Sequence, residues 1–170
     1  KKVIVGTEDE LTLAYDLAIY TAPPGRSRPL DRFARNEPPP AGSDEALMLD
    51  AMRNARFAVL IVQRPHRLAG LVLTDIFRDE EIWLVDEGLE VSLEEGAAYA
   101  TRYYTPGPFS MTAGVGVPVH RRFLMDAIEE HAPQLIRKPP DQLIDDPRFA
   151  EAIYRTAVRE GLMEDVLYLD

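Results

Sequence analysis

The chain has 170 residues, 46% of them hydrophobic, no cysteine and a formal net charge of −10. A chain of this length forms one domain by default and buries roughly 70% of its unfolded surface. The lack of cysteine excludes a disulfide framework, thiolate chemistry and a zinc–thiolate site. No run approaches the ~20 apolar residues of a membrane span, and no signal peptide is visible. We therefore expect a cytoplasmic protein of one domain, with a helical arm and cover (1–55), a β core (56–119) and C-terminal helices (120–170).

The charge is unevenly distributed along the chain. Residues 21–67 hold eight arginines and five acidic residues, whereas residues 68–122 hold four arginines and nine acidic residues. Residues 123–170 hold five bases and eleven acidic residues. The acidic balance makes a nucleic-acid partner unfavourable overall and confines any basic surface to the N-terminal third.

Helical signals begin close to the N-terminus. Val3–Val5 is typical of a short edge strand or a frayed arm, and Thr7 with Glu10 forms a capping-box pattern. Apolar residues at helical spacing predict a helix over Glu8–Tyr20, which Pro23-Pro24-Gly25 would end.

The next stretch, Gly25–Gly42, carries prolines at both ends and is expected to be an irregular arm lying across the body. Ser43 is a good N-cap for a second helix, which should end near Asn54.

The centre of the chain predicts a β-sheet. Leu68–Glu87 consists of two apolar runs that flank four charged residues, Arg78-Asp79-Glu80-Glu81, which we call the charged knot. This pattern is typical of a β-hairpin. Phe57–Val62 is apolar at successive positions, which favours a central strand covered on both faces. Further strands are expected at Val91–Leu93, at Ala98–Tyr104 and, as a close-packed strand or bulge, over Met111–Pro118. In the hairpin, Trp83 should be largely buried against a terminal helix.

The C-terminal part reads as helical. Phe123, Leu124, Ala127 and Ile128 share one face of a helix that Pro133 would end. Asp146-Pro147 is a helix start and Gly161 a C-cap. The fold class that follows is α+β, with a small, curled or barrel-like, mostly antiparallel sheet flanked by N- and C-terminal helices.

Two acids in the hairpin raise the possibility of a ligand site. With the turn centred on Asp79-Glu80, Asp75 would face Leu84 and Asp86 would face Leu73, all on one face. Such a pair is either an acid couple with raised pKa or two rim residues that cap turns, and the second interpretation is favoured. A ligand-binding pocket would be built from these two acids together with two residues of the strand Ala98–Tyr104, which gives the set Asp75, Asp86, Arg102 and Tyr104.

A basic cluster is formed by Arg26, Arg28, Arg32 and Arg35, with Asp31 among them. Arginine side chains suit carboxylate or phosphate recognition. The cluster either docks an acidic partner or a nucleic-acid backbone, or it ties the arm to the acidic body of the same chain. The net charge of −10 favours the second interpretation.

Other motifs give less information about function. The Walker A, GxSxG, HExxH, EF-hand and GxGxxG patterns are absent, and Gly114-Val115-Gly116 favours a bulged strand over a phosphate loop. The three histidines (His66, His120 and His131) are far apart in sequence, so neither a metal site nor a cofactor is expected. Three tyrosines on the strand Ala98–Tyr104 (Tyr99, Tyr103 and Tyr104) indicate core packing, or a stacking platform for single-stranded nucleic acid.

Several segments together resemble a group of uncharacterised bacterial proteins of proteobacterial type. They lie at residues 31–35, 55–57, 69–71, 83–89 and 111–114, and the resemblance covers most of the chain. It implies a bacterial, cytoplasmic protein of unknown function and transfers no catalytic residue. We expect a non-enzymatic binding or regulatory module that acts through protein contacts. The alternatives are a small-ligand-binding protein or enzyme, and a single-stranded nucleic-acid binder.

Overall fold

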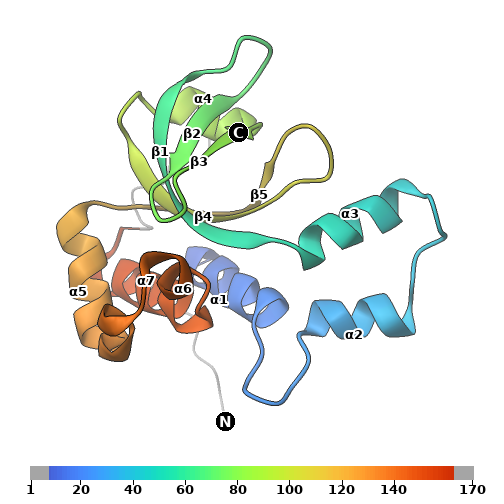
Figure 1. Cartoon of the computed structure of the whole chain (residues 1–170), viewed down its shortest axis with the longest axis horizontal. Helices are drawn as coiled ribbons and strands as arrows, with labels where there is room; N and C mark the ends of the chain where they lie inside the picture. Colours follow the sequence, from blue (N-terminus) through green and yellow to red (C-terminus); the bar gives the residue numbers. More distant parts are fainter. Residues whose placement is uncertain (1–7, 163–170) are drawn as a thin grey trace.

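The computed structural model describes residues 8–162, which form an α+β fold (Figure 1). The strands are β1 (Arg56–Pro65), β2 (Leu71–Asp75), β3 (Glu80–Leu84), β4 (Ala98–Tyr104) and β5 (Met111–Pro118). The α-helices are α1 (Glu8–Tyr20), α2 (Pro29–Asn36), α3 (Asp44–Arg53), α4 (Glu87–Ser92), α5 (Arg121–His131), α6 (Pro140–Ile144) and α7 (Pro147–Glu160). A 3₁₀ helix, η1 (Pro133–Arg137), joins α5 to α6.

The five strands form one antiparallel sheet in the order β3-β2-β1-β4-β5. β1 is the central strand, as its continuous apolar sequence predicts. Phe57 and Val59 belong to the core on one face, whereas Ala58, Leu60 and Val62 belong to the core on the other. Because both faces are covered, β1 needs no polar alternation.

The terminal helices cover one face of the sheet, and α1, α5 and α7 pack there (Figure 1). Aromatic rings join the layers: Phe57 meets Phe149 and Tyr154 edge to face, with ring centroids 6.0 Å and 5.6 Å apart. Such contacts add stability beyond the area they bury. The expected cover of the sheet by helices from both ends of the chain is confirmed.

The opposite face curls around a second core, which we call the inner core, and Leu89 of α4 and Leu93 just after the helix pack against it. The two edges of the sheet meet at one point, where Leu84 and Ser110 form an isolated parallel bridge. Two backbone hydrogen bonds hold it: Ser110 donates to Trp83 at 2.7 Å, and Val85 donates to Ser110 at 2.9 Å. The sheet is therefore curled, but it is not closed into a barrel.

The hairpin register differs from the expected one. Asp75 pairs with Glu80, not Leu84, so Asp86 lies beyond the end of β3. The reason is side-chain chemistry in the turn: Asp75 Oδ1 accepts hydrogen bonds from the backbone of Phe77 and Arg78, at 2.9 and 3.3 Å. This Asx-type turn reverses the chain earlier than the charged knot suggested.

Trp83 was expected to pack against a terminal helix, and this prediction was wrong. The side chain is half-buried and lies on an edge strand, whereas the terminal helices pack over β1, β4 and β5. Its ring stacks on His66 with centroids 4.0 Å apart and its indole N–H donates to the Ala69 carbonyl at 2.8 Å.

Local signals placed most helices correctly. α1 spans Glu8–Tyr20 as expected, Ser43 caps α3, Asp146 caps α7, and Gly161 takes the left-handed conformation after α7. The N-terminal signals at Val3–Val5 and Thr7 lie outside the described residues.

Three α-helices were not expected: α2, α4 and the short α6 between η1 and α7. α2 forms inside the stretch predicted to be irregular, and α4 takes the place of the strand predicted at Val91–Leu93. α4 forms because Asp86 caps it, accepting a hydrogen bond from the Leu89 backbone at 3.1 Å. We name residues 25–54, with α2 and α3, the α2–α3 arm. Figure 1 shows it beside the sheet and its covering helices.

The stretch Met111–Pro118 is strand β5, as predicted, with an irregular register opposite Thr101–Tyr103. Gly114 has φ +96°, a conformation that favours glycine, and a Cβ there would meet no atom within 4 Å. At Gly116 the nearest atom to a Cβ is in the Tyr99 ring, at an ordinary 3.5 Å. The glycines are thus not explained by crowding at their own Cβ positions; Gly114 is explained by its backbone angle.

Candidate functional site

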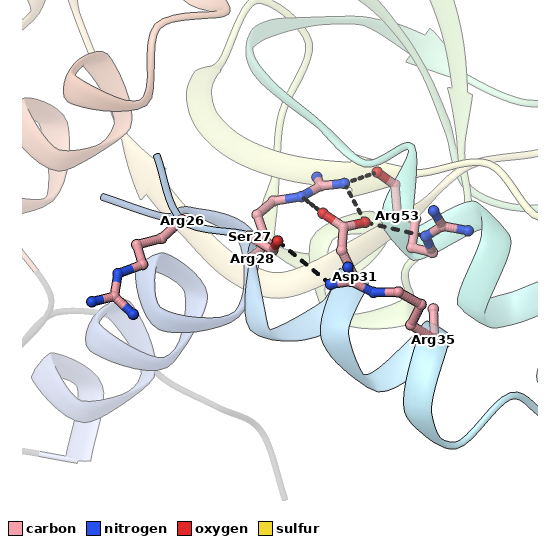
Figure 2. A pocket seen from close by; sticks show the side chains of 7 residues that line it. Arg26, Ser27, Arg28, Asp31, Arg35 and Arg53 are labelled. Carbon is pink, nitrogen blue, oxygen red and sulfur yellow. Dashed lines mark hydrogen bonds and ion pairs between the residues drawn. The ribbon is translucent and has the colours of Figure 1, made fainter. Parts of the chain in front are cut away.

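A hollow of about 470 Å³ opens on the α2–α3 arm (Figure 2). Its position follows from local sequence. Pro29 begins α2, so Arg28 stands just before the helix and Arg35 follows in its last turn. The last turn of α3 brings Arg53 to the same place. The lining residues are Arg26, Ser27, Arg28, Asp31, Ala34, Arg35 and Arg53.

One carboxylate joins the two helices. Arg28 donates from Nε and Nη2 to Asp31 at 2.7 and 3.1 Å, and from Nη2 to the Arg53 carbonyl at 2.9 Å. Arg53 Nε donates to Asp31 at 3.2 Å. The hydrogen bond from Arg28, with a smaller one from Arg53, lowers the pKa of Asp31 below its ordinary value. The Arg28–Asp31–Arg53 group therefore fixes α2 against α3.

The remaining arginines of the arm have no such partner. Arg32 Nη1 donates to the Ser27 carbonyl at 2.5 Å, and Arg35 Nη2 lies 3.4 Å from Ser27 Oγ. Arg26 is exposed, and in Figure 2 its side chain points away from Asp31. Within residues 8–162, no carboxylate forms an ion pair with Arg26, Arg32 or Arg35. The arm thus presents guanidinium groups whose charge the described chain does not neutralise.

A second hollow, of about 590 Å³, adjoins the first between α1 and α2 and shares Arg26 and Ser27 with it. Its lining is mostly apolar or aliphatic: Leu17, Ala18, Thr21, Ala22, Pro23, Pro29 and the edge residue Arg32. We call the two hollows together the arm groove. Guanidinium groups can bind carboxylate or phosphate in a bidentate manner, and the aliphatic half can accept apolar side chains.

Comparison with known proteins gives a family for the chain. The family model described as "Family of unknown function (DUF7986)" matches residues 1–163. The chain belongs to this family. No curated protein and no solved structure matches it. Membership agrees with the resemblance to uncharacterised proteins, while the bacterial origin stays a prediction.

In this family member, the four residues expected to share a ligand pocket lie in separate environments. Asp75 is buried in the β2–β3 turn, where Arg78 Nη1 donates to it at 2.5 Å. Arg78 also donates to the Phe57 carbonyl at 3.1 Å and to Asp145 at 2.5 Å. Asp86 caps α4 and accepts from Thr112 Oγ1 at 2.5 Å. Both acids cap local structure, as the favoured interpretation predicted, but Asp75 is buried and does not lie at a rim.

Arg102 points into the helix-covered side of the sheet. Its Nε and Nη2 donate to Asp16 at 2.9 and 3.1 Å, and Tyr154 donates to the same carboxylate at 3.0 Å. The guanidinium lies 4.8 Å from the centre of the Tyr20 ring. Burial, and next the Asp16 charge, raise the pKa of Tyr20 to about 12. The group joins α1, β4 and α7 and is closed to a ligand.

Tyr104 lies elsewhere, in a hollow of about 120 Å³ between α3 and β4. Tyr99 and Tyr103 are buried in the inner core, so they form no open stacking platform. Among residues 8–162, Tyr99 Oη finds no hydrogen-bond partner, and burial raises the pKa of Tyr99 well above the ordinary value.

The histidines are also dispersed. His66 stacks on Trp83, His120 caps α5, and His131 ends α5. Within residues 8–162, no group of three potential ligands is placed to hold a metal ion. No helix in the same range is long and apolar enough to cross a membrane.

Sequence reasoning found four of the groove arginines but missed Arg53, which is distant from them in the chain. It also missed Asp16, although this acid lies on the buried face of α1 with Leu13 and Tyr20. An acidic residue at helical spacing among apolar ones was the available signal for a buried ion pair.

Proposed function

We propose that the protein is a binding module whose arm groove docks an acidic segment of a partner protein. One observation carries the proposal. Three exposed arginines border the groove without a carboxylate partner in the described chain, while Arg28 and Arg53 share Asp31. The alternative interpretation, in which these arginines tie the arm to the acidic body of the same chain, has less support, because the described body supplies no carboxylate to the three residues.

The recognition chemistry follows from the two halves of the groove. Carboxylates of the partner would pair with Arg26, Arg32 and Arg35, while aliphatic side chains would occupy the half lined by Leu17 and Pro23. Exposed charge pairs mainly increase the rate of association and orient the two proteins, and salt weakens them. Apolar contact would therefore supply part of the affinity.

A protein segment suits this surface better than nucleic acid. The net charge of −10 opposes a polyanion that extends beyond the groove, because phosphate backbones need a broad basic face. The buried positions of Tyr99 and Tyr103 offer such a strand no stacking surface.

The proposal is tested by fluorescence anisotropy with a labelled decapeptide rich in glutamate and leucine. We expect binding at low salt that weakens as salt is added. The triple variant R26E/R32E/R35E should lose at least tenfold in affinity, because each substitution replaces attraction by repulsion.

Three controls accompany this measurement. A matched peptide with glutamine for glutamate tests the charge, an oligothymidine strand tests nucleic acid, and R67E/R121E/R122E makes the same charge change on exposed sites outside the groove. Equal binding by both protein variants, or tighter binding of oligothymidine than of the acidic peptide, would contradict the proposal.

A further inference from the structure

The acidic counterpart of the groove can be sought in the chain itself. Residues 79–101 contain eight acidic residues and no lysine or arginine. Within them, residues 86–95 hold five acids; we call this stretch the acidic segment. It comprises α4 and the turn that follows.

The acidic segment presents both chemistries that the groove accepts. Glu87, Glu94 and Glu95 are exposed, and none forms an ion pair within residues 8–162. Val91 is 74% exposed beside them, although α4 is otherwise anchored to the inner core by Leu89 and Leu93. α4 and the turn that follows it thus display carboxylates together with one exposed apolar side chain.

The groove and the acidic segment do not meet within one molecule. Figure 1 shows α4 on the far side of the sheet from the covering helices, well separated from α2. The ion pairs that leave β3 go to β1, from Glu80 to Arg56 and from Glu81 to Arg64, not to the arm. Each molecule therefore carries a basic and an acidic surface that only another molecule can join.

We propose that the arm groove of one copy receives the acidic segment of a second copy. The inference rests on the proposed function and names the partner. Reciprocal contact around a two-fold axis would use both surfaces of each copy, and closed two-fold dimers are the commonest homo-oligomers. Charge complementarity favours this occupant. Arg26, Arg32 and Arg35 form no ion pair with a carboxylate within residues 8–162, and the glutamates of the acidic segment form none with a cation there.

The test measures molar mass by light scattering and sedimentation equilibrium on the full chain, over protein concentration and salt. We expect concentration-dependent association at low salt that weakens at high salt. The arm variant R26E/R32E/R35E and the segment variant E87R/E94R/E95R should each reduce self-association at least tenfold.

Mixing the two variants is the decisive measurement. The acidic arm of the first then faces the basic segment of the second, while the unchanged arm and unchanged segment also face each other. Association should therefore return in the mixture and in neither variant alone. The control R67E/R121E/R122E should associate like the parent, and circular dichroism checks that every variant is folded.

Two results would overturn the inference: a parent that stays monomeric at low salt, or two weakened variants whose mixture does not associate. The glutamate–leucine peptide separates this failure from failure of the proposed function. A monomeric parent that binds the peptide through the arm keeps the binding module and loses self-recognition, whereas a parent that does neither loses both.

Discussion

In the body of the molecule, Arg78 and Arg102 are buried and each donates to a carboxylate of the same chain. In the arm, Arg26 and Arg32 are exposed, and no carboxylate among residues 8–162 forms an ion pair with them. A buried guanidinium must be paired because an uncompensated charge in the core is costly. An exposed guanidinium is solvated and remains available to a partner. The same residue type thus fixes the body and equips the arm for recognition.

The largest expected effect comes from breaking a buried pair. Asp16→Ala should destabilise by ~3–5 kcal/mol, because it leaves Arg102 charged and buried. Asp31→Ala, in the arm, should cost less than ~1 kcal/mol, since solvent screens its partners. Urea unfolding of both variants measures the difference. Equal losses would break the contrast between body and arm.

A second contrast uses two glycines with positive φ. Gly70 in the body has φ +76°, and a Cβ would lie 2.1 Å from the Leu84 carbonyl oxygen. Gly70→Ala should therefore cost ~2–3 kcal/mol, through overpacking and strain. Gly42 in the arm has φ +81° with nothing within 4 Å of a Cβ, so Gly42→Ala adds strain alone and should cost about 1 kcal/mol. Thermal melts would contradict this if Gly42→Ala were the more damaging change.

The body should also respond to alkaline pH through Tyr20. Its pKa is raised to about 12 in the folded protein, so folding favours the protonated phenol. This contribution is complete below pH ~10, the unfolded pKa, and is lost as pH rises toward the folded value. Tyr20 alone should lower stability by up to ~1.4 kcal/mol per pH unit in this window, in addition to the loss from Tyr99 and Tyr154, whose pKa values are also raised. Tyr20→Phe should remove the Tyr20 share of the slope. An unchanged slope in the variant would assign the alkaline loss to other groups.

The smallest effect is expected in the arm. Arg32→Glu should change stability by no more than ~0.5 kcal/mol, since Arg32 is exposed and forms only a backbone contact in the described chain. At a protein concentration low enough to keep the parent monomeric, melts at low and high salt should agree with the parent at each salt. A clear loss at low salt that disappears at high salt would show that the arm is held by the acidic body.

The elements predicted correctly have local causes. Ser43 and Asp146-Pro147 are capping signals that act within one helical turn, and the apolar run of β1 reports its cover on both faces. α2 was missed because prolines at its borders resembled an extended stretch, although Pro29 serves as its first residue. The hairpin register was missed because the side chain of Asp75, not the charged knot, sets the turn.

The candidate site could be predicted only for those residues that lie close together in the sequence. Four arginines close together in sequence indicated a basic surface, but Arg53 joins this surface only through the tertiary packing of α3. The predicted ligand pocket was assembled from an expected hairpin register, for Asp75 and Asp86, and from the neighbouring strand in the chain, for Arg102 and Tyr104. Arg102 instead turns to Asp16, which lies 86 positions away and supplies the carboxylate that the buried charge requires.

The hydrogen bond from Tyr154 to Asp16 spans 138 positions, and this separation bears on the order of synthesis. On the ribosome, β1, β2 and β3 emerge as a meander before β4 supplies Arg102, and α7 follows much later. Until then Asp16 lacks its phenol and the Phe57 ring lacks the two aromatic neighbours that α7 provides. We expect nascent chains stalled before α7 to be cleaved readily by protease and chains that include it to resist. Equal resistance of both would show that the N-terminal elements complete the core without the last described helix.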